Sequence, residues 1–310
     1  MIYCQDGLGL GHLRRTSNIA RAVLARVPDC AVLVVSDCPA TPFFAPLPGM
    51  DHLKLPTVIK TGEVWHNGLP IDISETLRLR TRLILEAFAE FRPDTVLVDH
   101  LPVGALGELV PLIEHATEGR VRLFFGLRDV MDAPEVVRRL WSNVGAYTYL
   151  ERYNAVLAYG CRDVYDVASA YGVSSHARTV INCNYVVSPS VDRAECAASD
   201  ERLVVALGGG GYDAFPLAAG FLDALPMLRQ ETAVRGVILP GPTMPAAHRQ
   251  LLLERAASQG AEVRAGYEDA LPWLNRATAV VTMAGYNSLC ESLQEGKKVL
   301  TVPFTLEASG

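Results

Sequence analysis

His12 and Asp99 are the side chains in this sequence that we expect to do acid–base chemistry. His12 follows the glycine-rich loop 7–11, and Asp99 follows the apolar run 95–98 at the carboxyl end of an expected strand. Polar residues at the carboxyl ends of parallel strands often face a ligand cleft. A structural role stays open for each, because His12 could cap or pack the start of a helix and Asp99 could cap the following helix.

A second kind of chemistry is indicated by the run 279–291, with the sequence AVVTMAGYNSLCE. An apolar strand here enters a glycine turn at Gly285, and a helix follows. The first amides of such a helix are unpaired and lie at the positive end of the helix dipole, where a phosphate is favoured. Glu291 lies in the second turn, close enough to reach a sugar hydroxyl beside that phosphate. We therefore predict that this turn binds a nucleotide-activated sugar.

Three further segments have both a functional and a structural interpretation. Four glycines at 208–211 follow a strand and favour close approach of a ligand, although a flexible turn is the simpler interpretation. The pair 128–129, Arg-Asp, ends another strand and could be a surface ion pair that contributes little to stability. Tyr286 and Asn287 could be structural, since an asparagine at a helix start can itself bond the free amides.

The composition restricts the class of protein. The chain has 310 residues, of which 50% are hydrophobic and 20% charged, so it can bury large cores and should form two domains. A net charge of −6 lacks the basic excess of a nucleic-acid-binding protein. The sequence contains neither an apolar run long enough to span a membrane nor a signal-peptide pattern, and its seven cysteines lack disulfide or zinc-site spacing. We expect a soluble, cytoplasmic protein with no transmembrane segment, no nucleic-acid partner and no metal.

The elements that must position the polar residues alternate between strands and helices. In the first half we expect strands at 2–5, 31–35, 52–55, 95–98, 121–125, 155–158 and 179–181. The helices expected between them span 74–91 with Ser74 as the cap, 104–116, a segment ending near Tyr147, and 164–171. Residues 56–73 have no regular pattern and are predicted to form a mobile loop near a cleft.

The second half repeats this alternation after a break at 185–200, which we interpret as a linker. Strands are expected at 203–207, 234–239, 262–264, 279–282 and 299–302, with helices at 214–228, 245–259, 268–275 and after Gly285. Both halves begin with a strand and a glycine-rich loop. The predicted fold class is therefore α/β, with a Rossmann-like domain at 1–184, a second at 201–310, and an interdomain cleft.

Two motifs resemble those of the GT-B glycosyltransferases. The first reads YCQ at 3–5 and LGLGHLRR at 8–15, and the second reads AGYNSLCE at 284–291 followed by GKKVLTVPF at 296–304. The chain is most similar to the branch that contains the N-acetylglucosaminyltransferase of peptidoglycan synthesis (glycosyltransferase family 28), and within it to predicted bacterial glycosyltransferases that open with this YCQ motif. The resemblance spans both domains and is specific for fold and donor class, not for substrate.

The resemblance implies a metal-independent hexosyltransferase without a cofactor. It would move a sugar, expected to be N-acetylhexosamine-like, from a UDP-linked donor to a small-molecule or lipid-linked acceptor, and peripheral contact with a membrane is compatible with the latter. The catalytic residues would be His12 and Asp99, because the leaving diphosphate gains charge and a base must take the acceptor's proton. The acceptor side would include Gly9, Gly11, His100 and Arg128. The donor would contact Gly209, Gly210, Gly211, Gly266, Tyr267, Ala284, Gly285, Tyr286, Asn287, Ser288 and Glu291.

The same resemblance assigns these donor contacts to parts of the nucleotide sugar. The two glycine turns would lie against the diphosphate, Glu291 would bind the ribose, and the backbone near Gly266 and Tyr267 would contact the base. The family continues after the VPF sequence with a loop that carries a Glu-Gln or Gln-Gln pair on the donor sugar, so we expect the C-terminal domain to be incomplete. Two alternatives stay open: a nucleotide-sugar hydrolase or 2-epimerase of the same fold, and a non-catalytic nucleotide-sugar-binding protein.

Overall fold

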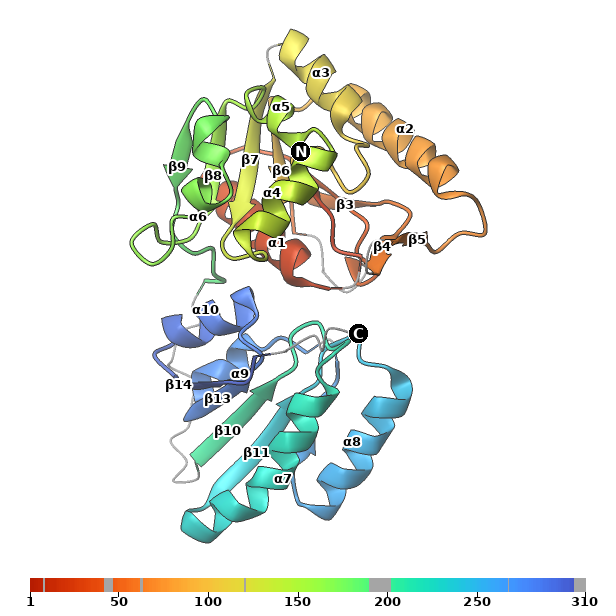
Figure 1. Ribbon diagram of the computed structural model, residues 1–310. Helices are drawn as coiled ribbons and strands as arrows, with labels where there is room; N and C mark the ends of the chain where they lie inside the picture. The colour runs from red at the N-terminus through yellow and green to blue at the C-terminus, as the bar shows by residue number, and fades with distance from the viewer. Residues whose placement is uncertain are drawn as a thin grey trace. The chain divides into compact units, whose positions relative to one another are not determined.

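The chain forms two compact units, each built on a parallel sheet with helices packed against it (Figure 1). Unit 1 comprises Met1–Gly7 and His12–Val186, and unit 2 comprises Leu8–Gly11 and Val187–Gly310. The predicted α/β class with two Rossmann-like domains is therefore confirmed, whereas the predicted domain boundaries and the cleft stay predictions. The structure, a computed structural model, describes residues 1–7, 9–41, 47–61, 64–119, 121–189, 202–266 and 268–303.

The sheet of unit 1 has seven parallel strands in the order β3-β2-β1-β6-β7-β8-β9. Its strands are β1 (Ile2–Cys4), β2 (Val32–Ser36), β3 (Met50–Lys54), β6 (Thr95–Asp99), β7 (Arg122–Arg128), β8 (Ala155–Tyr159) and β9 (Val180–Asn182). The chain proceeds from β1 to β2 and β3 in one direction and resumes at β6 on the other side of β1. The carboxyl ends of β1 and β6 therefore lie at the point where the strand order reverses, which is where open α/β sheets bind ligands.

Helices and apolar side chains build the core of unit 1 around the central strands. The helices are α1 (Gly11–Leu24), α2 (Ile73–Phe91), α3 (Val110–Glu118), α4 (Pro134–Asn143), α5 (Ala146–Leu150) and α6 (Val167–Ala170), followed by the 3-10 turn η2 (Val173–Ser175). One buried cluster joins β6, β7 and β8 to the helices α2 to α6, and within it the ring of Phe125 contacts those of Trp141 and Tyr153.

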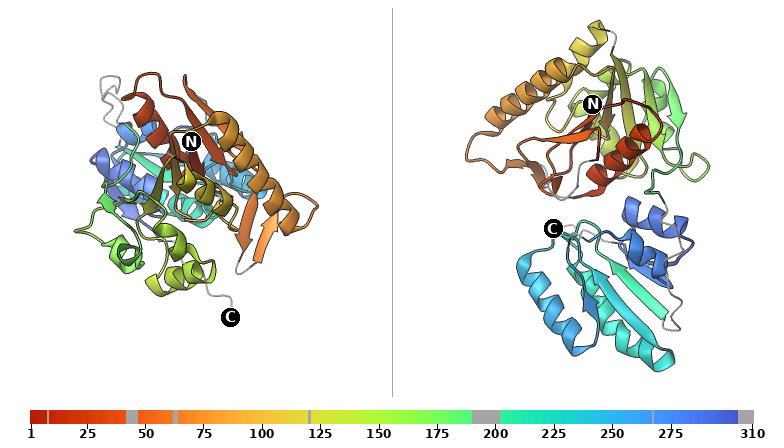
Figure 2. Two further views of the ribbon diagram at one scale, coloured as in Figure 1. Left: turned by 90° about the horizontal axis from the view of Figure 1, so that it is seen from above. Right: turned by 180° about the vertical axis from the view of Figure 1, so that it is seen from behind.

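Two predictions for the region between β3 and α2 are wrong. Instead of an irregular loop, residues 58–67 contain an antiparallel hairpin of β4 (Val58–Thr61) and β5 (Val64–Asn67), which packs against α2 (Figure 2). These strands are too short to give a clear alternating pattern in the sequence. The cap of α2 is Asp72 rather than Ser74, because Glu75 at the third helical position completes a capping box with Asp72.

Three predicted helices of unit 1 are shorter or divided in the structure, two of them because of glycines. The helix expected from residue 104 begins at Val110, because Gly104 and Gly107 have φ values of +83° and +88°. The helix expected to end near residue 147 is divided into α4 and α5 by Gly145, at φ +64°. The helix expected at 164–171 is confined to α6. A left-handed residue cannot continue an α-helix, so each such glycine is a boundary.

The sheet of unit 2 has five parallel strands in the order β12-β11-β10-β13-β14. Its elements are β10 (Arg202–Leu207), α7 (Phe215–Glu231), β11 (Val234–Leu239), α8 (Ala246–Ser258), β12 (Glu262–Val263), α9 (Leu271–Arg276), β13 (Ala279–Thr282), α10 (Tyr286–Gln294) and β14 (Lys298–Thr301). The helix expected from 268 starts three residues late, at Leu271. Strand order reverses between β10 and β13, as it does between β1 and β6 in unit 1.

Alternate residues of β10 enter two different cores. Leu203, Val205 and Leu207 pack with α9, whereas Val204 and Ala206 pack with α7 and α8. Because both faces of the sheet are covered, its strands read as continuous apolar runs in the sequence. This pattern is what allowed β10, β11 and β13 to be predicted closely.

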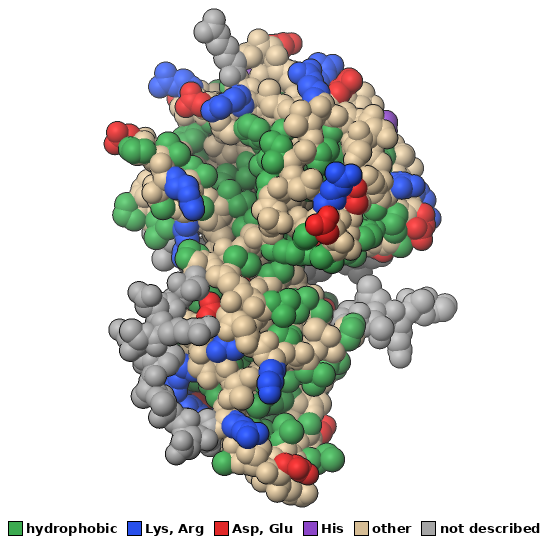
Figure 3. Space-filling view, turned by 90° about the vertical axis from the view of Figure 1, so that its left-hand side faces the viewer, with side chains coloured by type: hydrophobic (Ala, Val, Ile, Leu, Met, Phe, Trp, Pro, Cys, Tyr) green, Lys and Arg blue, Asp and Glu red, His purple; other side chains and the backbone are tan. Residues whose placement is uncertain are grey.

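The face of the molecule drawn in Figure 3 carries charged side chains of both signs. On the face drawn in Figure 3, lysine and arginine side chains are interspersed with acidic and uncharged ones. Among the described helices, none has both the length and the apolar character needed to cross a membrane.

Candidate active site

The reversal of strand order in unit 1 brings His12 and Asp99 together. Strands β1 and β6 are neighbours, with Cys4 opposite Asp99, and α1 begins one residue before His12. Nδ1 of His12 lies 2.7 Å from Oδ2 of Asp99, and the side chains are 13% and 0% exposed. The interpretation of Asp99 as a helix cap is wrong, since the next helix, α3, begins only at Val110.

Arg15 keeps Asp99 ionised inside the unit. Its Nε donates to Oδ1 at 3.1 Å and its Nη2 to Oδ2 at 2.7 Å, and the guanidinium is almost fully buried. Burial alone would raise the pKa of Asp99, but the Arg15 guanidinium, with His100 and His12, holds that pKa well below its usual range. Asp99 is therefore a carboxylate that can only accept hydrogen bonds.

His12 is neutral in these surroundings. Burial lowers its pKa well below the ordinary value, and His100 and Arg15 lower it further against the opposing effect of Asp99. Nη2 of Arg15 lies 2.6 Å from Nδ1, but it also donates to Asp99. Because Asp99 carries no proton, we assign the ring proton of His12 to Nδ1, where it bonds the carboxylate. Nε2 then keeps a free lone pair, as a general base requires.

His100 stacks on the ring of His12. The ring centroids lie 3.6 Å apart at an interplanar angle of 19°. The His100 backbone has φ +53°, a conformation that non-glycine residues rarely adopt, and its amide donates to the Gly126 carbonyl at 2.8 Å. Its Nδ1 lies 3.7 Å from Oδ2 of Asp99, beyond hydrogen-bond range. His100 therefore fixes the plane of the His12 ring without displacing it from Asp99.

Arg128 and Asp129 lie at the carboxyl end of β7 and form a partly buried ion pair. Both side chains are 27% exposed, and Nε of Arg128 lies 3.8 Å from Oδ1 of Asp129. Within the described residues neither of these two atoms has a hydrogen-bond partner, although Nη2 of Arg128 donates to the Val130 carbonyl. The guanidinium thus retains a donor at the edge where His12 and Asp99 lie.

Three of these side chains could in principle be metal ligands. His12, Asp99 and His100 each offer one ligand atom, and these atoms lie within 4.8 Å of one another. However, both oxygens of Asp99 are bonded by Arg15, and nearly parallel stacked rings do not direct their lone pairs at one ion. The donor set therefore fits a hydrogen-bonded histidine–carboxylate pair better than a metal centre.

In unit 2, the predicted phosphate turn leads from β13 into α10. Gly285 is the N-cap residue and has no side chain with which to cap this helix. Among the described residues Oδ1 of Asn287 has no hydrogen-bond partner, so the proposed self-capping by Asn287 is wrong. Ala284 before it has φ +63°, and a Cβ added at Gly285 would have no atom within 4 Å. Ser288 and Tyr286 lie in the same first turn. The start of α10 therefore offers the positive end of a helix dipole and open space beside Gly285.

The glycine run 208–211, which follows β10, has two separate explanations. A Cβ at Gly208 or Gly211 would lie 2.5 Å or 2.6 Å from the carbonyl oxygen of Pro240. These two glycines are required by the protein's own backbone. Gly209 has φ +57° and no atom within 4 Å of its Cβ position. Only that part of the run leaves space for a ligand to approach.

Glu291, predicted to bind a ribose, already accepts a hydrogen bond from a hydroxyl. The residue lies on α10 and is 3% exposed, and its Oε1 accepts from Oγ of Ser188 at 2.7 Å. Nε2 of Gln294, one turn further along α10, donates to the Ser188 carbonyl at 3.2 Å. Ser188 thus occupies on this carboxylate the kind of position that a sugar hydroxyl would take.

A pocket of ≈ 560 Å³ in unit 2 includes Gly266, which was predicted to contact the base. Nη2 of Arg249 donates to the Gly241 carbonyl at 2.9 Å, and a Cβ at Gly266 would lie 2.6 Å from the same nitrogen. Tyr267 lies outside the described residues. The pocket is lined chiefly by Pro242, Met244, Arg249, Gln250, Leu253 and Gly266.

Sequence reasoning missed several residues that hold this arrangement together. Arg15 lies one helical turn after His12, a spacing that would have suggested that both face Asp99. Asp6 accepts hydrogen bonds from the amides of His12 and Leu13, but its distance from α1 matches no capping motif. Ser188 lies within the predicted linker 185–200 and carried no functional signal in the sequence.

Comparison with known proteins bears on the fold. No family model matches the chain, and neither does any curated protein. Among solved structures, a UGT transferase from Siraitia grosvenorii in complex with UDP matches with a TM-score of 0.56 and 16% identity, over 99% of this chain and 82% of that one. A UGT of Phytolacca americana, complexed with UDP-2-fluoro-glucose and pterostilbene, matches with a TM-score of 0.62 and 14% identity, over 99% and 81%.

A bacterial structure gives the same result. The glycosyltransferase from Rickettsia africae matches with a TM-score of 0.56 and 10% identity, over 97% of this chain and 78% of that one. At these identities the likeness concerns the fold alone. The chain therefore has the GT-B fold of these glycosyltransferases.

Proposed function

We propose that the protein is a glycosyltransferase that moves a sugar from a UDP-sugar to a hydroxyl group of a small-molecule or lipid-linked acceptor. The observation that carries the proposal is the contact of 2.7 Å between Nδ1 of His12 and the buried Asp99 carboxylate. The GT-B fold supports it, and so do the UDP and UDP-sugar ligands named for similar structures.

In the proposed reaction, Nε2 of His12 takes the proton of the acceptor hydroxyl. The acceptor oxygen attacks C1 of the donor sugar, the bond from C1 to the diphosphate oxygen breaks, and its electron pair leaves with UDP. The imidazolium that forms is stabilised by the ionised Asp99 beside Nδ1, as in other histidine–carboxylate pairs. Such a reaction requires no metal, provided that the protein stabilises the charge of the leaving diphosphate.

Unit 2 is proposed to bind the donor. The start of α10 and the open backbone at Gly209 and Gly285 would bond the diphosphate. The base would enter the pocket at Gly266, and Glu291 would bond the ribose after releasing Ser188. Donor binding would then use mainly backbone amides and one carboxylate.

The motifs favour one branch of this fold and one cellular location. We propose that the chain belongs with glycosyltransferase family 28, on the strength of the segments 8–15 and 284–291, and that its donor sugar is an N-acetylhexosamine. The scattered cysteines support a cytoplasmic location.

The proposal is tested by titrating the protein with UDP in a calorimeter and by measuring UDP release from UDP-N-acetylglucosamine and UDP-glucose. We expect UDP to bind and release from the UDP-sugars to require an added acceptor. UDP release with water alone would favour the hydrolase, and absence of any nucleotide binding would reject the proposal. Tighter binding of UDP-glucose than of UDP-N-acetylglucosamine would argue against the family 28 branch.

A further inference from the structure

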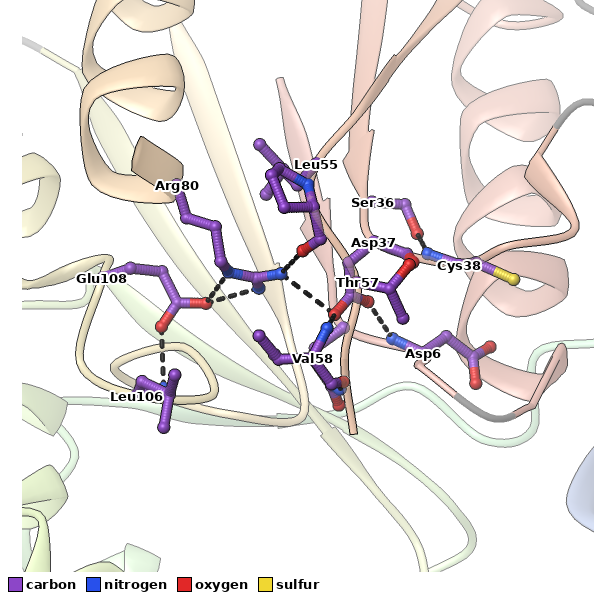
Figure 4. A network of polar contacts seen from close by, with 12 residues as sticks. Asp6, Ser36, Asp37, Cys38, Leu55, Thr57, Val58, Arg80, Leu106 and Glu108 are labelled. Carbon is purple, nitrogen blue, oxygen red and sulfur yellow. Dashed lines mark hydrogen bonds and ion pairs between the residues drawn. The ribbon is translucent and has the colours of Figure 1, made fainter. Parts of the chain in front are cut away.

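A buried polar network in unit 1 joins Asp6, after β1, to Asp37, Arg80 and Glu108 (Figure 4). At its centre, Arg80 of α2 is fully buried, and its Nη1 donates to Oδ2 of Asp37 at 3.0 Å. Its Nε and Nη2 donate to Oε1 of Glu108 at 3.1 Å and 2.6 Å. The hydroxyl of Tyr3 donates to the same oxygen at 2.7 Å. The guanidinium is thus fixed between two buried carboxylates.

Asp37 links the Arg80 guanidinium to the backbone of Asp6. Its Oδ1 accepts from the Asp6 amide at 2.8 Å, and its Oδ2 accepts from the Val58 amide at 3.3 Å as well as from Arg80. Asp37 is fully buried, so these bonds are not exchanged for bonds to water. The backbone of the loop after β1 is therefore tied to α2 and to the start of the β4–β5 hairpin.

Asp6 in turn holds the start of α1. Its Oδ2 accepts from the amides of His12 and Leu13 at 2.9 Å and 3.1 Å, and its residue is 6% exposed. Two of the amides that a helix start leaves unpaired are thus satisfied. One of them belongs to His12, so a single carboxylate fixes the backbone from which the imidazole reaches Asp99.

The composition of the network indicates that it serves position rather than stability. Two carboxylates, those of Asp37 and Glu108, flank the buried Arg80 guanidinium, and a third buried carboxyl group, that of Asp6, lies further along the network. Apolar side chains of similar volume commonly stabilise a core as well as or better than such buried ionic groups. Apolar side chains, however, cannot accept a hydrogen bond from a particular backbone amide, as the Asp6 and Asp37 carboxylates do.

We propose that Asp6, held by Asp37, is a positioning residue for His12: it fixes the His12 backbone so that the ring meets Asp99. The inference deepens the proposed function, since the position of His12 affects the rate only if His12 is the base. A displacement of about 1 Å of a reacting group costs on the order of 100-fold in rate.

The test compares Asp6→Ala with Asp6→Asn, because asparagine keeps an oxygen that can accept both amides and alanine does not. We expect Asp6→Ala to lower kcat for sugar transfer by about 10- to 100-fold with the Kd for UDP unchanged, and Asp6→Asn to stay within about 3-fold of the unaltered protein. The matched control is Asp72→Ala, which removes an aspartate from the start of α2 and should leave kcat unchanged.

A second readout does not depend on turnover. In protein labelled with ¹⁵N-histidine, the Nδ1–H signal of His12, identified by its loss in His12→Gln, should shift or broaden in Asp6→Ala and be retained in Asp6→Asn. This readout decides the inference even if no UDP-sugar is turned over, an outcome that would reject only the proposed function. The inference is overturned if Asp6→Ala leaves the His12 signal unchanged. It is also overturned if Asp6→Asn behaves like Asp6→Ala in both readouts, because charge rather than position would then be what matters.

Discussion

The two units begin α1 and α10 after similar glycine turns but treat the free amides of these helices in opposite ways. In unit 1 the amides of His12 and Leu13 are bonded by the Asp6 carboxylate. In unit 2 the N-cap is Gly285, which has no side chain with which to cap the helix. An anion can therefore be attracted to α10, whereas at α1 a carboxylate of the protein already holds that position.

This difference shows that a glycine turn between a strand and a helix does not define a function. At α1 the turn serves to hold a side chain, His12, against Asp99. At α10 it exposes backbone. We expect substitutions at α1 to change the chemical step and substitutions at α10 to change donor affinity.

The largest effect is expected from His12→Ala. Removal of a general base typically lowers the rate by 10²- to 10⁴-fold, so we expect kcat to fall by about 10³-fold. The Kd for UDP should change by less than about 2-fold, because the donor binds unit 2. Initial rates of sugar transfer and calorimetric titration with UDP give the two quantities. A large loss of UDP affinity with kcat preserved would reverse the roles assigned to the two helix starts.

The next largest effect is expected from Asp99→Asn, on stability as well as rate. The change removes the negative charge beside the buried Arg15 guanidinium, and breaking such a buried pair costs about 3–5 kcal/mol. Urea denaturation would measure this loss. The double variant Arg15→Met with Asp99→Asn should recover part of the free energy of unfolding without recovering activity. Equal stability of Asp99→Asn and the unaltered protein would contradict the assignment of Asp99 as ionised.

Gly285→Ala tests the start of α10, where the donor diphosphate is proposed to bind. The residue has φ −59° and no atom within 4 Å of a Cβ, so alanine should be accepted without loss of stability. If a diphosphate approaches this backbone, the methyl group should weaken UDP binding by about 10-fold, or ~1.4 kcal/mol. Thermal unfolding and UDP titration separate the two effects. Unchanged UDP affinity would place the diphosphate elsewhere.

The sequence predicted the frame of both sites better than the contacts within them. Buried parallel strands such as β10 and β11 are continuous apolar runs, and their alternation with helices predicts a parallel sheet. The different roles of the two glycine turns could not be predicted, because Asp6 lies too far before α1 to match a capping motif and Arg80 reaches Asp37 only through the tertiary fold. Asp37 and Arg80 are 43 residues apart, and the His12–Asp99 contact joins residues 87 apart. Such pairs leave no periodic signal in one sequence.

The contact between Glu291 and Ser188 offers a smaller test, because substitutions of these two residues are expected to change the affinity for UDP in opposite directions. If the ribose bonds this carboxylate by displacing Ser188, Glu291→Ala should weaken UDP binding by about 3- to 10-fold. Ser188→Ala removes the competing hydroxyl and should strengthen UDP binding by about 2- to 3-fold. The 2′,3′-dideoxy analogue of UDP, which lacks both ribose hydroxyls, should not distinguish either variant from the unaltered protein. Weaker binding in both variants would mean that Ser188 supports the donor site instead of occupying it.

The smallest effect is expected in the pH dependence of thermal stability, which should change when Asp6 at the start of α1 is replaced but not when Gly285 at the start of α10 is replaced. Burial raises the pKa of Asp6 to about 7 against the opposing effect of the Leu13 and His12 amides, above the value of about 3.9 in an unfolded chain. The folded state then binds a proton that the unfolded chain lacks between about pH 4 and 7. This stabilisation is fully present below about pH 4 and is lost as the pH rises through about 7. Asparagine does not ionise, so the Tm of Asp6→Asn minus that of the unaltered protein should be higher at pH 9 than at pH 5 by at least about 3 °C. Gly285→Ala changes no titratable group, and its Tm difference should be the same at both pH values. If the Tm difference of Asp6→Asn is also the same at pH 5 and pH 9, the two amides at the start of α1 stabilise ionised Asp6 as fully as water does.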